Sequence, residues 1–264
     1  MNKEKLDSLY ERYNHPSFVE NDPVRFIHRY SRKADQEVAG FVGAMLAFGQ
    51  RTVMIPFIER ILGHLGDKPY NALIAGIDRK LNRMDSLVYR FIRGVDIRFM
   101  LYKIHRVLKE YGSLEGLFRE GFSRTNNLKS SLIHFVSVLN NVTVPDSLAD
   151  RVKGRERQSQ FLISSPSGQS ACKRLNLFLR WMVRKDCVDM GLWHWMPREL
   201  LLIPVDTHVA RLSRCLSLTM RKNPDWKMAE EITNRLKEWS PDDPVKYDLA
   251  LFGSGVHDPQ ALLG

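Results

Sequence analysis

Apolar residues repeat at the spacing of an α-helix along almost the whole chain, and this pattern constrains the fold most strongly. Two of the clearest stripes consist of Val38, Phe41, Val42, Met45 and Leu46, and of Ile97, Leu101, Ile104 and Leu108. Such spacing gathers apolar side chains on one face of a helix, whereas a half-buried strand alternates apolar and polar residues. Because no convincing alternating strand is present, the sequence predicts an all-α protein. Its 264 residues, 44% of them apolar, can bury a sizeable core in one large domain or in two halves.

Stripes, capping residues and helix breakers together give the expected helices. Apolar stripes run over residues 38–46, 54–62, 97–108, 132–139, 175–182, 209–216 and 228–236, and further helices are predicted over residues 3–13, 70–75, 86–92, 113–122 and 243–252, with a short one from Pro23. Asp96 is expected to cap one helix, and Gly66, Gly112 and Gly253 to end others. Residues 141–160 are polar and basic, and Pro145 breaks helices, so this segment is predicted to connect two lobes.

The chain carries a formal net charge of +10, from 40 Lys and Arg against 30 Asp and Glu. This excess suggests a polyanionic partner, although ordinary basic enzymes also show it. Between Asp150 and Lys185 nine basic residues stand against two acidic ones. The nine are Arg151, Lys153, Arg155, Arg157, Lys173, Arg174, Arg180, Arg184 and Lys185. We therefore expect a positive stripe along this segment.

Targeting and redox features indicate an ordinary intracellular protein. The first fourteen residues contain no apolar core of signal-peptide length, and no run approaches the roughly 18 apolar residues of a membrane span. Cys172, Cys187 and Cys215 are an odd number of cysteines, so no disulfide framework is expected. The sequence thus predicts a cytoplasmic protein.

Asp206 stands directly before an amphipathic run, in the segment from Ile203 to Leu212. The side chain of an aspartate there accepts hydrogen bonds from the first backbone N–H groups of the helix, and the helix dipole keeps the carboxylate ionised. Pro204 stiffens the approach. On these residues alone, Asp206 is most simply a helix cap.

Lys173 follows the strongest turn signal in the chain, residues 164–171 (SSPSGQSA), and lies in the first turn of the next predicted helix. The helix dipole and the cations expected nearby, Arg174 and Arg180, favour the neutral, nucleophilic form of its amine. A solvated lysine or a phosphate contact is the simpler interpretation, and Lys185 is the nearest rival amine.

The segment Val205-Asp206-Thr207-His208-Val209-Ala210-Arg211-Leu212 resembles the Val-Asp-Thr-His-φ-φ-Arg-φ segment of the helix-hairpin-helix DNA glycosylase superfamily. There the aspartate caps a helix and faces the reacting sugar. Similar pieces in the same order are Gly49-Gln50, Ala171-Cys172-Lys173-Arg174-Leu175-Asn176 and Tyr247-Asp248-Leu249-Ala250-Leu251-Phe252-Gly253, so the similarity runs in patches from about Val38 to Phe252. Lys173 and Asp206 lie 33 positions apart, which looks like the archaeal 8-oxoguanine glycosylase branch rather than the endonuclease III branch. As a whole, the chain looks like a separate bacterial branch.

This resemblance implies a two-lobed helical fold with a DNA cleft between the lobes. The first lobe is expected at about residues 34–144. Residues 1–33 join residues 145–264 in the second lobe, because the N-terminal helix packs there in the superfamily. The implied activity is base-excision repair: a monomeric DNA glycosylase, with lyase activity at abasic sites, acting on an oxidised purine such as 8-oxoguanine in double-stranded DNA. No cofactor is implied.

The resemblance also gives individual residues their expected roles. Lys173 is the expected nucleophile and Asp206 its electrostatic partner. Gln50 enters the base stack, with a polar turn residue as the alternative, and Arg51 beside it is also expected to contact DNA. The expected contacts to the DNA backbone are Ser167, Gly168, Gln169, Ser170 and Arg174, and the expected base pocket is Trp181, Trp193 and Trp195, although aromatics in such positions more often belong to the core.

Departures from the superfamily pattern keep other functions open. The usual hairpin, Leu-Pro-Gly-φ-Gly, has two glycines, and residues 166–170 retain one. A non-catalytic DNA- or RNA-binding protein on the same scaffold is therefore an alternative, and a basic protein-interaction module is a third.

No cysteine follows Cys215, which excludes the four-cysteine iron–sulfur cluster of some relatives. His194 and His208 have no partners at metal-ligand spacing, and no phosphate-binding loop or dinucleotide fingerprint is present.

Overall fold

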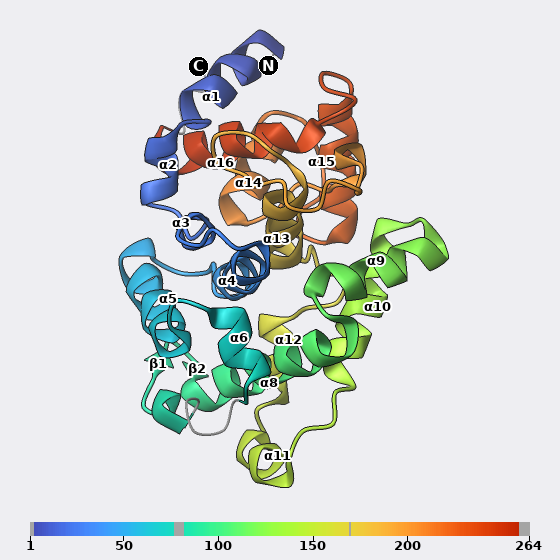
Figure 1. The fold of residues 1–264 in the computed structure, drawn as a ribbon. Coiled ribbons are helices and arrows are strands. Elements are labelled where there is room, and N and C mark those ends of the chain that lie inside the picture. Colours follow the sequence, from blue (N-terminus) through green and yellow to red (C-terminus); the bar gives the residue numbers. More distant parts are fainter. Residues whose placement is uncertain (1–2, 77–81, 169, 259–264) are drawn as a thin grey trace. The chain divides into compact units, whose positions relative to one another are not determined.

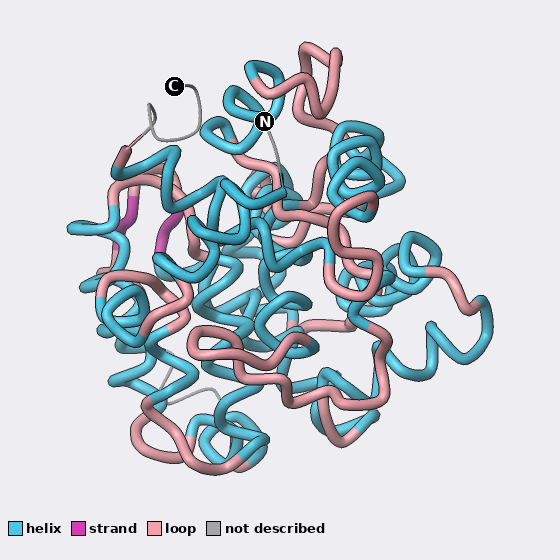
Figure 2. Tube along the Cα trace, turned by 90° about the horizontal axis from the view of Figure 1, so that it is seen from above, coloured by secondary structure: helices cyan, strands magenta, loops and turns pink. Residues whose placement is uncertain are grey.

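The computed structural model describes residues 3–76, 82–168 and 170–258, and almost all of its regular structure is helical (Figures 1 and 2). The prediction of an all-α protein is therefore confirmed. The chain divides into two compact units. Unit 1 consists of Met1–Val24 and Pro166–Gly264, and unit 2 of Arg25–Ser165. The chain thus passes between the units at Val24–Arg25 and at Ser165–Pro166, rather than near residues 33 and 144.

Unit 2 is built around one long helix, α8 (Gly94–Tyr111), against which the neighbouring helices pack. Its elements are α3 (Arg25–His28), α4 (Lys33–Met45), α5 (Arg51–Leu65), α6 (Pro69–Ile74), η1 (Asn82–Met84), β1 (Val88–Tyr89), β2 (Ile92–Arg93), α8, α9 (Leu114–Thr125), α10 (Leu128–Asn140), α11 (Asp146–Val152) and α12 (Glu156–Leu162). The predicted stripe on α8 is buried throughout. Its burial against α6, α9 and α10 gives the unit its core.

Local residues predicted both ends of α8, and the role of one of them needs correction. Gly112 takes a φ of 75° and ends the helix, as predicted. Asp96 does not occupy the cap position itself. It lies three residues after Arg93, and its carboxylate accepts the Arg93 backbone N–H at 2.7 Å in a capping box. Asp96 therefore stabilises the helix start by a different hydrogen bond from the one expected.

Two other predictions in unit 2 are wrong. Residues 86–92 do not form a helix: β1 and β2 form an antiparallel hairpin there, with Tyr89 opposite Ile92. β-Branched and aromatic residues favour a strand at such a half-buried position, and the short stretch gives helical periodicity little weight. Residues 141–160 are not a bare connection, because they contain α11 and most of α12, both of which pack on α8.

Unit 1 joins the N-terminal helices to the C-terminal part of the chain. Its elements are α1 (Lys3–Tyr13), α2 (Pro16–Glu20), η2 (Pro166–Gly168), α13 (Lys173–Val183), η3 (Arg198–Leu200), α14 (Thr207–Cys215), α15 (Trp226–Lys237), η4 (Pro244–Lys246) and α16 (Tyr247–His257). Helix α16 contacts both α1 and α14. A Cβ atom at Gly253 would lie 2.5 Å from the Tyr13 ring. Gly253 therefore lets α1 pack closely on α16, which continues past the glycine expected to end it.

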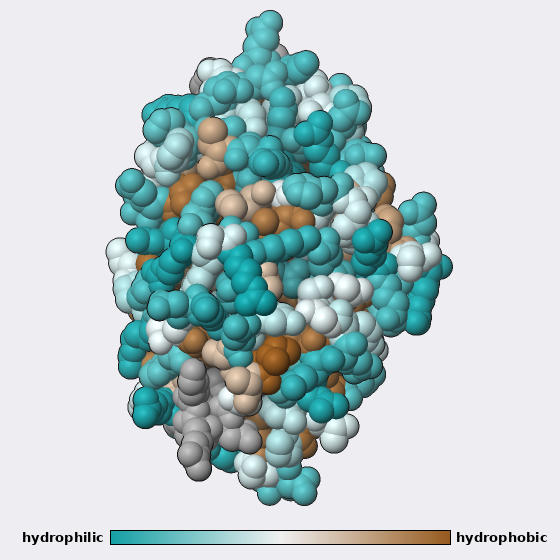
Figure 3. Space-filling view, viewed as in Figure 1, coloured by the Kyte–Doolittle hydropathy of each residue, from teal (hydrophilic) through white to brown (hydrophobic). Residues whose placement is uncertain are grey.

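The face shown in Figure 3 is mostly hydrophilic, with hydrophobic residues in separate small areas. Among the described residues, no helix combines the length and the apolar character that crossing a membrane requires.

Candidate functional site

Asp206 is the N-cap of α14, as the sequence predicted. Its Oδ1 accepts hydrogen bonds from the backbone N–H groups of His208 and Val209, both at 2.8 Å. The incoming chain is fixed as well, because the Ile203 N–H donates to Thr233 Oγ1 at 3.0 Å. Since Oδ1 takes both capping bonds, Oδ2 remains for another partner.

Lys173 is the first residue of α13. The chain reaches it through Cys172, whose φ of 46° is left-handed, and the Cys172 N–H donates to Ser170 Oγ at 3.1 Å. One turn on, the Asn176 side chain donates to the Ala171 carbonyl at 3.0 Å. These local bonds fix the start of α13 and hence the position from which the lysine side chain extends.

The two residues meet within unit 1. Lys173 Nζ lies 3.5 Å from Asp206 Oδ2, and the side chains are 27% and 14% exposed. Charged N–H···O bonds are usually about 2.7–2.9 Å long. The pair is therefore in contact without a tight bond, and both groups keep access to solvent. An amine beside a partly shielded carboxylate can act as a nucleophile whose developing cationic product the carboxylate stabilises.

Two residues of α16 complete the surroundings of this pair. The Phe252 ring centroid lies 5.9 Å from Lys173 Nζ, and Phe252 is only partly buried. Asp248, one helical turn earlier, is 3% exposed and accepts a hydrogen bond from Arg180 through Oδ2. Its Oδ1 has no hydrogen-bond partner among the described residues. Burial raises the pKa of Asp248 to about 6, the charge of Asp206 adds to the shift, and Arg180 and Lys173 oppose it.

Sequence reasoning gave neither α16 residue a role at the site, since both entered only as parts of the similar segment from Tyr247 to Gly253. A signal was available. Asp248 stands inside an otherwise apolar helix, and Phe252 follows at four residues, so both lie on one face of α16. A charged residue within a buried helix usually has a specific partner, which here is Arg180.

The expected positive stripe is not continuous. Arg180 and Arg184 are buried and bind carboxylates of unit 1, and Arg151 and Arg155 pair with Asp85 and Asp96 in unit 2. The acidic partners of the two buried arginines are Asp186, Asp189, Asp243 and Asp248. Arg180 therefore does not act as an uncompensated cation toward Lys173. Carboxylates therefore compensate these four of the nine basic residues in the segment.

The predicted base pocket needs correction. Trp181 and Trp193 are both 0% exposed, and Phe178 packs edge-on against Trp193 at 5.4 Å between ring centroids. Rings enclosed in this way present no face on which a base could stack. They belong to the core, and only Trp195, which is half-buried, keeps part of its surface accessible.

The predicted hairpin residues occupy a short turn at the start of the second part of unit 1. Ser167 and Gly168 are exposed in η2, Ser170 is half-buried, and Gln169 lies outside the described residues. A Cβ atom at Gly168 would meet no other atom within 4 Å, so the backbone there is open to a ligand. Arg174, also expected to contact DNA, is 9% exposed, and burial lowers its pKa to about 10. Little of its guanidinium can reach a phosphate.

Gln50 begins α5 in unit 2. It occupies the cap position, but its side chain makes no capping hydrogen bond and is exposed, and Arg51 beside it is half-buried. An amide that serves no local bond is available to an external partner.

The rival amine, Lys185, is exposed beyond the end of α13, and no carboxylate among the described residues pairs with it.

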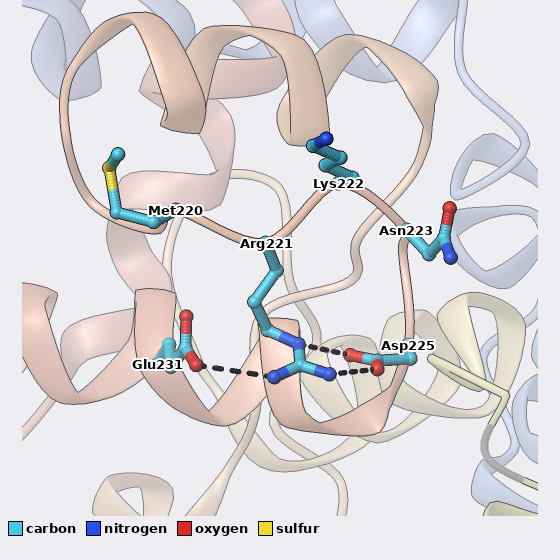
Figure 4. Close-up of a pocket in the computed structure, with 6 residues that line it drawn as sticks. All are labelled: Met220, Arg221, Lys222, Asn223, Asp225 and Glu231. Carbon is cyan, nitrogen blue, oxygen red and sulfur yellow. Dashed lines mark hydrogen bonds and ion pairs between the residues drawn. The ribbon is translucent and has the colours of Figure 1, made fainter.

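A surface depression of about 450 Å³ lies elsewhere, on the loop between α14 and α15 (Figure 4). There Arg221 is held by Asp225 and Glu231. The cation of Arg221 is therefore already compensated, and none of the predicted site residues lines the depression. In the described ranges, no three His, Cys, Asp or Glu side chains come together as a metal site.

Comparison with known proteins identifies the family. Residues 22–257 match the model of the family described as "Protein of unknown function (DUF2400)", and the chain belongs to this family. Neither curated proteins nor solved structures gave a match.

Proposed function

We propose that this protein is a DNA glycosylase with lyase activity at abasic sites, acting on an oxidised purine in double-stranded DNA. The observation that carries the proposal is the 3.5 Å approach of Lys173 Nζ to Asp206 Oδ2. The two groups come from the starts of separate helices, and both remain accessible. The resemblance of their sequence segments to the helix-hairpin-helix glycosylases gives this geometry its chemical interpretation.

In this mechanism, Lys173 Nζ attacks C1′ of the damaged nucleotide. The bond from C1′ to the base breaks, and the base leaves with the electron pair and takes up a proton. The ionised Asp206 stabilises the positive charge that develops on the sugar. Loss of protons from the amine and opening of the sugar ring give an imine between Nζ and C1′. Removal of a proton from C2′ then expels the 3′ phosphate and cuts the strand, and water releases Nζ.

The surrounding groups fit an extruded purine. Base-excising enzymes hold the flipped base by stacking and by hydrogen bonds to its edge. Phe252, beside the amine, offers a ring for stacking. Phe252 is the neighbour that can contact the base, since Asp248 is only 3% exposed and its Oδ1 is buried.

Borohydride trapping tests the proposal. With a duplex containing 8-oxoguanine or an abasic site, borohydride should reduce the imine and link the protein covalently to DNA. Lys173→Gln should reduce this cross-linking to background and leave binding of the duplex unchanged. Lys185→Gln is the matched control, because that amine lies at the other end of the same helix without a carboxylate partner, and it should cross-link normally.

Cross-linking that survives in Lys173→Gln would remove Lys173 from the role of nucleophile. Salt-sensitive DNA binding without a product on any oxidised purine or abasic site would instead support the alternative, a binding protein that retains the scaffold.

A further inference from the structure

The hairpin of unit 2 exposes large apolar side chains. Val88 is 63% exposed and Phe91 43%, whereas Tyr89 and Ile92 of the same hairpin are buried. Arg90 forms the turn with a φ of 56°. Large apolar groups that are exposed next to one another mark an interaction surface more often than singly scattered ones do.

Phe91 belongs to a cluster of three rings, which we call the aromatic patch: Phe48, Phe91 and Phe161. Phe91 and Phe161 lie 4.8 Å apart between centroids at 77°, and Phe48 and Phe161 lie 4.9 Å apart at 83°. Phe161 is 36% exposed. These edge-to-face contacts hold the rings against one another and leave the outer two accessible.

Hydrogen bonds also fix the backbone of two residues of the patch. Tyr89 lies 5.0 Å from Phe48 and donates its hydroxyl to the Phe48 carbonyl. Arg155 donates to the Phe91 carbonyl at 3.0 Å while paired with Asp96. A surface prepared in this way loses little conformational entropy when it binds a flat partner.

The charges around the patch are positive. Arg90 and Arg93 are exposed, and neither forms an ion pair with another described residue. The nearby carboxylates are occupied, because Asp85 pairs with Arg98 and Arg151, and Asp96 with Arg155. The patch therefore combines exposed rings with uncompensated cations, which complements a polyanion carrying flat apolar groups.

Gln50 lies next to this surface. A Cβ atom at Gly49 would stand 2.5 Å from Tyr89 Oη and 3.1 Å from Arg90 Nη1, so the turn before α5 is packed against the hairpin. The exposed Gln50 amide and the aromatic patch therefore lie in one region of unit 2.

We propose that the aromatic patch is a stacking platform for unpaired nucleic-acid bases, with Arg90 and Arg93 binding the adjacent phosphates. The protein then binds DNA that contains unpaired nucleotides more tightly than continuous duplex. This inference goes beyond the proposed function: it requires only unit 2 and does not depend on the Lys173–Asp206 chemistry.

Fluorescence anisotropy tests it with three labelled DNAs: a 12-nucleotide oligothymidylate, a duplex with a three-nucleotide bulge, and the same duplex without the bulge. The wild-type protein should bind the first two more tightly. Replacing both rings with Ala, in Phe91→Ala/Phe161→Ala, should weaken their binding by about tenfold or more, the usual loss for one stacked base, and should hardly change binding of continuous duplex. Val53→Ala, which shortens another exposed apolar residue (54%), is the matched control.

Phe91→Leu/Phe161→Leu keeps the apolar surface and removes the ring planes, so it should weaken binding as the Ala variant does. Wild-type affinity in the Leu variant would overturn the proposal, since apolar contact alone would then suffice, as for a protein partner. Equal affinity of the wild-type protein for all three DNAs would also overturn it. An unchanged melting temperature shows that each variant folds.

Failure of this inference is distinguishable from failure of the proposed function. Lys173→Gln should keep the preference for unpaired bases, and the Phe91→Ala/Phe161→Ala variant, at saturating protein, should still cross-link to an abasic site.

Discussion

Unit 1 and unit 2 each place a lysine amine beside oxygen atoms, but the two amines differ in exposure and in partners. Lys173 is partly exposed and faces the carboxylate of Asp206. Lys103, on α8 of unit 2, is 2% exposed, and its amine donates to Asn140 Oδ1 at 2.9 Å and Ser159 Oγ at 3.0 Å, both neutral oxygens. Burial lowers the pKa of Lys103 to about 8.

The comparison separates two criteria for a candidate amine, a shifted pKa and an accessible position beside an anion. Strongly shifted pKa values are common at functional sites, so Lys103 would be a candidate on that criterion alone. A nucleophile must also reach its substrate and have a group that stabilises the charge it creates. Lys173 is accessible and lies beside a carboxylate, while Lys103 connects α8 to α10 and α12 and has no anionic partner in the described part of the chain.

The largest effect expected within this comparison comes from removing the anion of the accessible pair. Asp206→Asn keeps an oxygen that can cap α14 but loses the charge, so cross-linking should fall by about 10²–10³-fold with stability nearly unchanged. Asp206→Ala loses the cap as well and should cost about 1 kcal/mol in the free energy of unfolding. Borohydride trapping rates and urea denaturation measure the two effects. Normal trapping in Asp206→Asn would reduce Asp206 to a helix cap.

The buried amine should affect stability instead, in a pH-dependent way. Below pH 8 Lys103 is charged in both the folded and unfolded states, and burial of its charge costs stability in full. Between pH 8 and 10.5 the folded protein has lost this proton while the unfolded chain still holds it, so the free energy of unfolding rises with pH. The full change is about 3 kcal/mol.

Lys103→Met removes this titration. The difference in unfolding free energy between wild type and Lys103→Met should therefore move in favour of the wild type from pH 8 to 10.5, as measured by urea denaturation at each pH. Trapping by folded Lys103→Met should stay at the wild-type level. A loss of trapping would show that the reactive amine had been assigned to the wrong unit.

How far the sequence predicted this arrangement depends on how local each interaction is. Asp206 could be recognised as a cap and Lys173 as a first-turn residue, because both roles follow from a few neighbouring residues. The burial of Trp181 and Trp193 could not, since a core tryptophan and a base-stacking one look alike in the sequence. Nor could the neutralisation of Arg180, whose partners Asp189 and Asp248 are 9 and 68 positions away.

The smallest effect tests whether unit 2 contributes to binding rather than chemistry. Gln50→Ala should leave the melting temperature unchanged, because the Gln50 side chain makes no capping hydrogen bond and is exposed. If the amide helps to hold the DNA stack open, processing of an 8-oxoguanine duplex should slow a few-fold, about the worth of one hydrogen bond. Cross-linking to an abasic site, where no base has to leave, should change less. Thr52→Ala, which alters an exposed polar residue two positions on, is the control and should leave both rates unchanged. Equal slowing of both reactions by Gln50→Ala would mean that Gln50 acts on the chemical step, which would contradict the division of roles between the units.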